Sequence, residues 1–160
     1  MQYRDLHCTG GKVSEIGFGA WGIGGTLWLG GNDRDSLAAL HTAIDEGVTY
    51  IDTALAYGDG HSEQLIGEVC RNRSENLCIA TKIPPLNQLW PARSGIPLSE
   101  VFPPAHIRAS TIQSLENLGV EALALQQLHV WREEWVEDLR WLEELEQLKQ
   151  EGKIRAIGIS

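Results

Sequence analysis

Four side chains that can move or hold a proton stand at related places in this sequence. Asp52, Lys82 and His129 each come at the end of a short apolar run, and Tyr57 follows Asp52 in a glycine-rich turn. Short apolar runs of this kind predict buried strands, and the carboxyl ends of the parallel strands of a barrel meet at one face. We therefore expect a carboxylate, a phenol, an ammonium and an imidazole to lie together there.

The chemistry that these groups can share is proton donation to a carbonyl group. A tyrosine with its ordinary pKa of about 10 is too weak an acid at neutral pH. The Lys82 ammonium is expected to lower the pKa of Tyr57 by stabilising the phenolate, and Asp52 to keep Lys82 charged and oriented. His129 is expected to hydrogen-bond the substrate oxygen and polarise it. Because no side chain supplies a hydride, reduction requires a cofactor.

Each of these residues also has a purely structural interpretation. Asp52 can cap a turn, Tyr57 can pack in a glycine turn, and His129 can be a hydrogen-bonded residue at a strand end. Lys82 is the least ordinary, because lysine rarely ends a buried strand without a partner. The joint pattern favours the chemical interpretation over any single structural one.

Amphipathic segments alternate with the apolar runs along the chain. The predicted strands cover 16–21, 48–52, 77–82, 122–130 and 154–159. Three predicted helices start at Asp33, Ser62 and Pro104, and Asp33 and Ser62 are expected to cap theirs. A fourth predicted helix has an apolar face formed by Val136, Leu139, Leu142, Leu145 and Leu148. This alternation predicts an α/β fold with a parallel sheet covered by helices. We expect one domain over 1–160, in which a β-hairpin occupies 1–15 and five strands with four helices occupy 16–160.

A glycine-rich motif raises the alternative of a doubly wound sheet. Residues 17–22 match G-x-G-x-x-G, but ten residues with further glycines separate Gly22 from the first predicted helix. In the dinucleotide-binding fingerprint the helix begins within the motif, and a small residue stands at the position of Trp21. The fingerprint also has an acidic residue about twenty residues further on, whereas Asp52 lies about thirty residues past Gly22. A (β/α)8 barrel explains the strand-end residues better.

Composition excludes several partners. The formal net charge of the 160 residues is -9, which argues against nucleic acid and anionic membranes and offers no basic pocket for a phosphorylated ligand. No apolar run is long enough to span a bilayer, and the first residues do not resemble a signal peptide. The 3 cysteines lack CxxC spacing, which favours reduced thiols in the cytoplasm, and the 5 histidines show no metal-ligand spacing. Residues 84–104 hold all 6 prolines in a long loop, which indicates a functional or mobile segment.

The sequence resembles the aldo-keto reductase family. The motifs that carry the resemblance are Gly17–Trp21, Gly47–Ala54, Tyr57–Glu63, Ala80–Lys82, Leu128–His129 and Gly152–Ser160. The resemblance implies a TIM barrel and NADPH-dependent reduction of an aldehyde or ketone, a small-molecule carbonyl substrate. It places Asp52, Tyr57, Lys82 and His129 on the family's catalytic positions, with Tyr57 as the general acid.

The same resemblance implies further site residues. Ser160 falls on a residue that holds the nicotinamide carboxamide, and Gly19, Trp21 and Asp52 are expected beside the cofactor. Trp21, Trp28 and Trp131 are expected to line an apolar substrate pocket, although packing explains Trp28 and Trp131 equally well. Gln126-Gln127 and Trp131 depart from the family's usual residues around the histidine, and we expect them to alter the local pocket.

Length sets the last expectation. A complete barrel has eight βα units and about 250 residues, so this chain is expected to be a barrel truncated after the fifth strand. The family's phosphate-binding loops would follow Ser160, so NADPH binding by this chain alone is expected to be weak or absent. Three hypotheses stay open: an oxidoreductase completed by a missing C-terminal half or by homo-oligomer formation, an inactive fragment, and a non-catalytic binding or regulatory module of the same fold.

Overall fold

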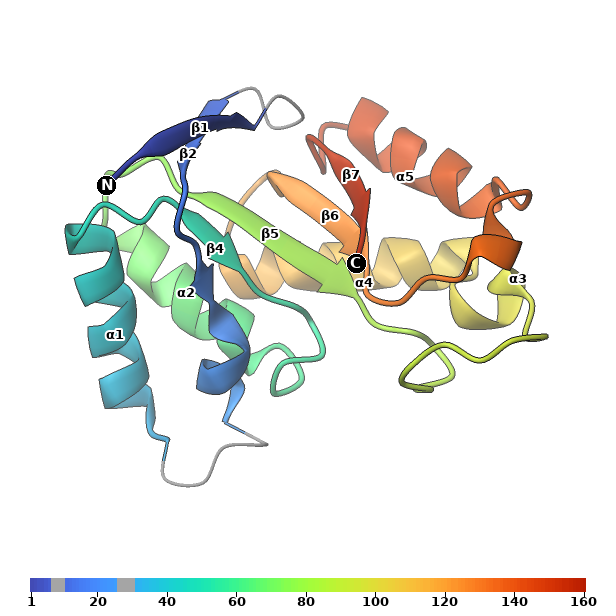
Figure 1. Ribbon diagram of the computed structural model, residues 1–160, viewed down its shortest axis with the longest axis horizontal. Helices are drawn as coiled ribbons and strands as arrows, with labels where there is room; N and C mark the ends of the chain where they lie inside the picture. The colour runs from blue at the N-terminus through green and yellow to red at the C-terminus, as the bar shows by residue number, and fades with distance from the viewer. Residues whose placement is uncertain (7–10, 26–30) are drawn as a thin grey trace.

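A five-stranded parallel sheet with helices along one face forms the centre of the molecule (Figure 1). The computed structural model describes residues 1–6, 11–25 and 31–160. The sheet strands are β3 (Phe18–Gly19), β4 (Tyr50–Asp52), β5 (Cys78–Ile83), β6 (Leu125–Leu128) and β7 (Ile157–Ile159). The longer helices are α1 (Asp33–Asp45), α2 (His61–Arg71), α4 (Pro104–Leu118) and α5 (Arg140–Gln150); the short ones are η2 (Ala20–Gly24), α3 (Leu98–Val101) and η3 (Glu133–Trp135).

The strand order identifies the sheet as part of a barrel. The five strands lie in chain order, β3-β4-β5-β6-β7, and every neighbouring pair is parallel. A doubly wound sheet reverses its order at a switch point, and no reversal occurs among the described strands. The glycine motif leads from β3 into the short helix η2, and α1 does not start until Asp33. The predicted barrel-type fold is confirmed, and the dinucleotide fingerprint is not realised.

The two faces of the sheet carry different side chains, as the alternation of a strand requires. One face packs against the helices and belongs to the main hydrophobic core, to which it contributes Ile51, Ile79, Ile83 and Leu128. The other face carries a small separate cluster formed by Tyr50, Ala80, Leu125 and Ala156. This second face corresponds to the interior of a barrel. In Figure 1, α4 passes behind β5 and β6, so that the interior face points toward the viewer.

The predicted amino-terminal hairpin is present as β1 (Tyr3–Leu6) paired antiparallel with β2 (Gly11–Ser14). Its turn lies outside the described residues. The hairpin joins the sheet at the start of β4, where Ser14 N donates to Thr49 Oγ1 and Thr49 N donates to Ser14 Oγ, both at 2.9 Å. It therefore covers the amino ends of the strands and leaves the carboxyl ends open for a site.

Two predicted helix caps are wrong. Asn32, not Asp33, caps α1, because its side-chain oxygen accepts a hydrogen bond from Asp35 N at 3.0 Å. Helix α2 starts after Gly60, which adopts a left-handed conformation with φ 88°, and it has no side-chain cap. Ser62 is already inside the first turn of α2, where its hydroxyl points to the strands instead.

The fourth predicted helix is shorter than expected. Helix α5 starts at Arg140, and the Asp138 carboxylate accepts a hydrogen bond from Arg140 N at 3.3 Å just before it. Val136 and Leu139 therefore precede the helix and are 61% and 54% exposed, whereas Leu145 and Leu148 are fully buried. The 3.6-residue period extends by chance beyond the true start, because Val136 and Leu139, which precede the helix, continue the apolar spacing.

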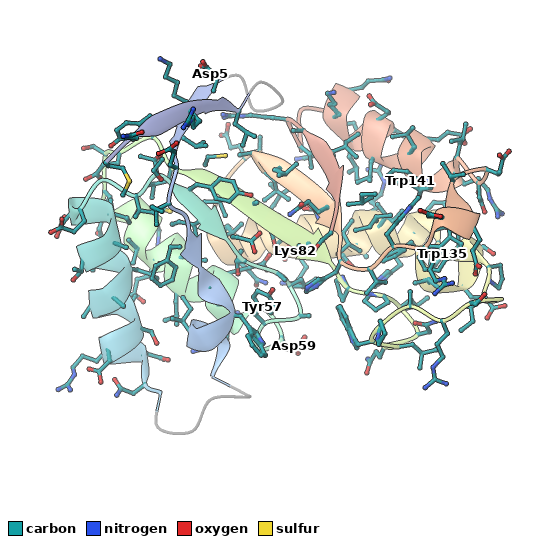
Figure 2. All side chains as sticks on the ribbon, viewed as in Figure 1. Asp5, Tyr57, Asp59, Lys82, Trp135 and Trp141 are labelled. Carbon is teal, nitrogen blue, oxygen red and sulfur yellow. The ribbon has the colours of Figure 1, made fainter. Side chains whose placement is uncertain are left out.

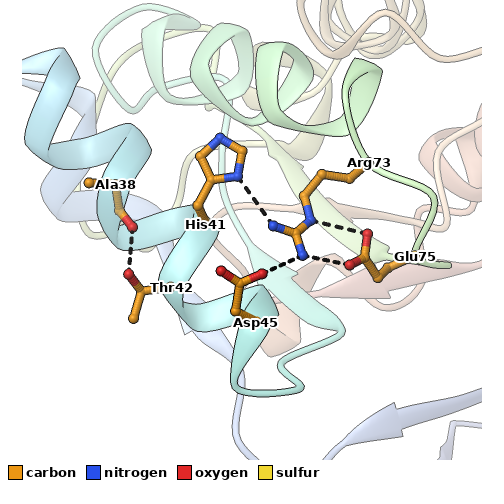
Figure 3. Close-up of polar contacts among 6 residues, drawn as sticks. All are labelled: Ala38, His41, Thr42, Asp45, Arg73 and Glu75. Carbon is orange, nitrogen blue, oxygen red and sulfur yellow. Dashed lines mark hydrogen bonds and ion pairs between the residues drawn. The ribbon is translucent and has the colours of Figure 1, made fainter.

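An arginine joins α1 to the loop that follows α2 (Figure 3). The Arg73 guanidinium donates to Asp45 at 2.7 Å, to Glu75 at 2.5 and 3.1 Å, and lies 3.3 Å from His41 Nδ1. Because the guanidinium has only donors, Nδ1 of His41 accepts in this contact. The cluster lies on the amino side of β5, at the opposite end of that strand from Lys82.

None of the helices in the described part of the chain is both long and apolar enough to cross a membrane.

Candidate active site

Lys82, which is buried, and Asp52, which is partly exposed, form an ion pair at the carboxyl ends of adjacent strands. Lys82 Nζ lies 2.8 Å from both carboxylate oxygens of Asp52 and 2.9 Å from the Thr53 carbonyl oxygen. The side chain of Lys82 is 6% exposed and that of Asp52 is 38% exposed. Because Asp52 and Lys82 share a strand face with Tyr50 and Ala80, both point to the barrel interior. The ammonium thus has three fixed acceptors and little water.

Tyr57 and His129 lie against this ion pair. The Lys82 ammonium is 5.4 Å from the centre of the Tyr57 ring. The rings of Tyr57 and His129 meet edge to face, with centroids 5.5 Å apart. His129 is the residue after β6, and its backbone N–H donates to the Ile83 carbonyl at 3.0 Å. All four residues expected from the sequence are therefore brought together, and Figure 2 shows Tyr57 and Lys82 at the same edge of the sheet.

The expected effect of Lys82 on the acidity of Tyr57 is not what the geometry produces. Burial raises the pKa of Tyr57 above its ordinary value, and the negative charge of Asp52 adds to the increase. Lys82 directs its ammonium to the Asp52 carboxylate and the Thr53 carbonyl, not to the phenol oxygen. Within the described residues the Tyr57 hydroxyl forms no hydrogen bond. Tyr57 is therefore fully protonated at neutral pH, with its hydroxyl available to a ligand.

The imidazole of His129 is expected to stay neutral at neutral pH. Burial lowers the pKa of His129 to about 4; the charge of Lys82 adds to this decrease, and Asp52 opposes it. An unfolded chain has a histidine pKa of about 6.5, so below that pH it binds more protons than the native state. This contribution to the free energy of unfolding is therefore complete above pH about 6.5 and is lost as pH falls toward about 4.

An NMR titration of the His129 ring checks this expectation and should give a midpoint near 4. In the variant His129→Gln, the free energy of unfolding should decrease less as pH falls below about 6.5 than it does in the native chain. A ring that titrates near the ordinary histidine value in the folded protein would contradict the burial described here.

Ser62 connects Thr53, which lies beside the ion pair, to Ala20 at the start of η2. Its hydroxyl donates to the Ala20 carbonyl at 3.0 Å and lies 2.8 Å from Thr53 Oγ1. Because Ser62 uses its only proton on Ala20, the Thr53 hydroxyl is the donor between the two. This contact holds Thr53, whose carbonyl oxygen is the third acceptor around Lys82. Ser62 was predicted as a helix cap, and this supporting position is not visible in the sequence.

Glu63 supports the other side of Lys82. Its carboxylate is fully buried and accepts hydrogen bonds from Thr81 Oγ1 at 2.6 Å and from Asn117 Nδ2 at 2.8 Å. Thr81 precedes Lys82 on β5, and Asn117 lies on α4. The pair Ser62-Glu63 at the start of α2 thus fixes one residue beside Asp52 and one beside Lys82. The sequence signals of this role were the motif Tyr57–Glu63 and the place of Glu63 three residues before Ile66, on the face predicted to be apolar.

The residues expected beside a cofactor lie at three strand ends. Gly19 pairs with Asp52 in the parallel register of β3 and β4, and a Cβ atom built on Gly19 meets no atom within 4 Å. Trp21 lies in η2 and is 49% exposed. Ser160 follows β7, and its N–H donates to the Leu128 carbonyl at 2.9 Å. Gly19, Asp52, Tyr50 and Leu125 also line an open pocket of about 500 Å³ on the interior face.

Of the tryptophans expected in a substrate pocket, Trp131 lies away from Tyr57. Trp28 lies outside the described residues. Trp131 packs edge to face on Trp135 and Trp141, with ring centroids 5.9 and 5.2 Å apart, and so belongs to an aromatic cluster near η3 and α5. The structure does not bring Trp131 to Tyr57. Trp135 and Trp141 are labelled in Figure 2, well away from Tyr57.

Trp90 is the aromatic residue that the sequence reasoning missed. Its ring meets that of His129 edge to face, with centroids 4.6 Å apart, and the residue is 47% exposed. It lies in the proline-rich loop after β5. The signal available in the sequence was an aromatic residue in a long loop that follows a strand ending in lysine.

The two glutamines before His129 face opposite sides of the sheet. Gln126 lies on the helix-facing side, is fully buried, and has no hydrogen-bond partner for either amide atom among the described residues. Gln127 lies on the interior side, where its Cγ is 3.0 Å from a Cβ built on Gly158. Only Gln127 therefore shapes the interior, and the expectation that Gln126 alters the pocket is wrong.

No group of three or more histidine, cysteine or acidic residues that could hold a metal ion occurs in the described part of the chain. The candidate site is therefore described by its ion pair, its phenol and its imidazole.

Comparison with known proteins gives a consistent picture. A sequence model of the aldo/keto reductase family matches residues 15–160. The chain is 34% identical to the aldo-keto reductase YhdN of Bacillus subtilis, over 100% of this chain and 47% of that protein. It therefore spans about half the length of this relative.

Solved structures agree. The glycerol dehydrogenase AKR11B4 from Gluconobacter oxydans is 34% identical, with a TM-score of 0.78 over 98% of this chain and 47% of that one. An aldo-keto reductase from Klebsiella pneumoniae, solved in complex with NADPH, is 30% identical, with a TM-score of 0.71 over 92% of this chain and 45% of that one.

Proposed function

Because the chain belongs to the aldo/keto reductase family, we propose that it carries the proton-donating half of an NADPH-dependent carbonyl reductase. Its substrate is an aldehyde or ketone, and Tyr57 is the proton donor. One observation carries the proposal: the Lys82–Asp52 ion pair, at 2.8 Å, lies against the rings of Tyr57 and His129 at the open edge of the sheet.

The protein groups divide the chemistry in the following way. The Tyr57 hydroxyl, protonated at neutral pH, donates its proton to the carbonyl oxygen as the alcohol forms. The Lys82 ammonium, held in place by Asp52 and Thr53, lies 5.4 Å from the centre of the Tyr57 ring and is positive charge beside the phenolate that remains. Neutral His129 donates a hydrogen bond to the same carbonyl oxygen and polarises it. Nδ1 of His129 is buried without a partner among the described residues, so Nε2 is the nitrogen assigned to this bond.

The proposed cofactor fits this chain in part. A reduced nicotinamide, when bound, supplies the hydride. Gly19 leaves open space beside Asp52, and Ser160 ends the strand on the other side of the interior face, so these residues suit the nicotinamide end. The interior pocket has no lysine or arginine in its lining, so it offers no cation to the phosphates. We therefore propose that NADPH binds this chain weakly. A homo-oligomer, a C-terminal half as partner and a cytoplasmic location all stay predictions.

Replacing Gly19 by valine should weaken NADPH binding without unfolding the protein. The backbone of Gly19 is extended, with φ -84° and ψ 114°, which any residue adopts, and the added carbons fill the space assigned to the nicotinamide. Cofactor fluorescence gives the affinity and thermal denaturation gives the stability. Gly11→Val on the hairpin is the matched control, since a Cβ there also meets no atom within 4 Å. Equal NADPH affinity in both variants would refute the assignment of Gly19.

The proposal is tested by NADPH oxidation that depends on an added carbonyl compound. We expect the purified chain to oxidise NADPH when an aldehyde is added at saturating cofactor. Binding of NADPH without any turnover would indicate a regulatory module instead. No binding at any reachable concentration would indicate an inactive fragment.

A further inference from the structure

A second cavity lies on the outer side of the loops that carry Tyr57 and Trp90. It has a volume of about 450 Å³, within the range of small-molecule sites. Its wall comes from the loop after β4, the loop after β5 and the first turns of α4. Asp52, Tyr57, Lys82 and His129 do not line it, so it is distinct from the candidate active site.

The polar lining of this outer-loop cavity consists of the side chains of Asp59, Gln88, His106 and Ser110. Asp59 contributes a carboxylate that forms no ion pair or hydrogen bond within the described residues. His106 Nε2 donates to the Pro84 carbonyl oxygen at 2.7 Å, because a carbonyl oxygen only accepts. Gln88 adds an amide. No lysine or arginine lines the cavity, so an anionic ligand finds no counter-charge.

Ser110 adds a hydroxyl group to the cavity wall. This serine on α4 is 5% exposed and lines the cavity, and its hydroxyl has no protein partner among the described residues. The Ser110 oxygen is not one of the fully buried polar atoms without a partner, so it can reach a molecule in the cavity. Because a hydroxyl both donates and accepts, it can accept a hydrogen bond from a ligand.

The remaining wall is apolar, and two polar residues of the lining have an uncommon backbone conformation. Leu55, Leu86 and Trp90 supply aliphatic and aromatic surface, and Leu86 and Trp90 are about half exposed there. Asp59 and Gln88, on the two loops, both adopt left-handed conformations with φ 54°. Non-glycine residues in such conformations are uncommon, and they gather at ligand-binding loops.

We propose that the outer-loop cavity binds a small organic molecule that combines a protonated amine with an apolar body. The amine pairs with the Asp59 carboxylate and donates to Ser110, and the body packs on Leu86 and Trp90. The Trp90 ring also packs edge to face on His129, so Trp90 connects the outer-loop cavity to the candidate active site.

The test uses three probes of equal size and different charge. Phenethylamine, 2-phenylethanol and phenylacetate are titrated into the isotope-labelled chain without cofactor, and backbone and Trp90 side-chain NMR signals are followed. We expect the amine to bind about tenfold more tightly than the alcohol, a difference of about 1.4 kcal/mol. Its shifts should include Asp59, Gln88, Ser110 and Trp90. Phenylacetate should not bind.

Two variants complete the test. Asp59→Asn should reduce amine affinity to that of the alcohol; asparagine tolerates the left-handed conformation, so the fold is kept. Asp5→Asn, at an exposed carboxylate on the hairpin at the opposite end of the molecule (Figure 2), should change nothing. The proposal is overturned if the amine and phenylacetate bind equally, if Asp59→Asn leaves amine affinity unchanged, or if the shifts lie elsewhere. None of these readouts depends on reductase activity, so the two proposals fail separately.

Discussion

Replacing Tyr57 by phenylalanine is expected to lower carbonyl reduction by about 10²–10⁴-fold, the usual contribution of a positioned proton donor. The change removes one oxygen that has no hydrogen bond to the described protein, so stability and NADPH binding should be nearly unchanged. Steady-state turnover with an aldehyde, measured beside cofactor affinity and melting temperature, separates these effects.

The matched control is Tyr3→Phe. Tyr3 lies on the hairpin, away from the carboxyl ends of the sheet strands, and its hydroxyl donates to the Gly47 carbonyl at 3.1 Å. That variant should keep full turnover. If Tyr57→Phe retained most of the activity, Tyr57 would not be the proton donor and the assignment of the site would be wrong.

The ion pair should respond asymmetrically to removal of its two members. Asp52→Ala leaves the Lys82 ammonium, 6% exposed, with only the Thr53 carbonyl as a partner, and an uncompensated buried charge of this kind costs about 3 kcal/mol. Lys82→Met leaves the Asp52 carboxylate, which is 38% exposed and can be hydrated, so the loss should be about 1 kcal/mol or less. Chemical denaturation of both variants measures the difference.

The double variant Asp52→Ala/Lys82→Met provides the internal control. Removing Lys82 from the Asp52→Ala protein removes the uncompensated charge, so the double variant should be more stable than Asp52→Ala alone. If instead the two single losses simply add, the ammonium is not buried as the structure has it.

The strand-end site was predictable because it depends on two regular properties of parallel strands. Side chains alternate between faces, and carboxyl ends converge at one edge, so Asp52, Lys82 and His129 could be grouped before any coordinates were known. The barrel followed from the same alternation of apolar runs and amphipathic helices. Only the glycine motif favoured another topology, and it leads into the short helix η2, while α1 starts at Asp33.

Features set by contacts between distant segments could not be predicted. Ser62 looks like a helix cap in the sequence, but its hydroxyl is used by Thr53 and Ala20, which the fold brings to it. The acidity of Tyr57 was misjudged because the sequence shows that a lysine is near, not where its ammonium points. Trp90 reaches His129 through an irregular loop, whose path no periodicity encodes.

Transfer of deuterium from cofactor to product tests the central proposal most directly. The purified chain is incubated with NADPH deuterated at the transferable nicotinamide position and with an aldehyde, and the alcohol is analysed by mass spectrometry. We predict an alcohol that carries one deuterium on the former carbonyl carbon, formed by the native chain and the Tyr3→Phe control and nearly absent with Tyr57→Phe. Deuterated alcohol no more abundant with the native chain than with Tyr57→Phe would contradict the proposal that Asp52, Tyr57, Lys82 and His129 reduce a carbonyl group.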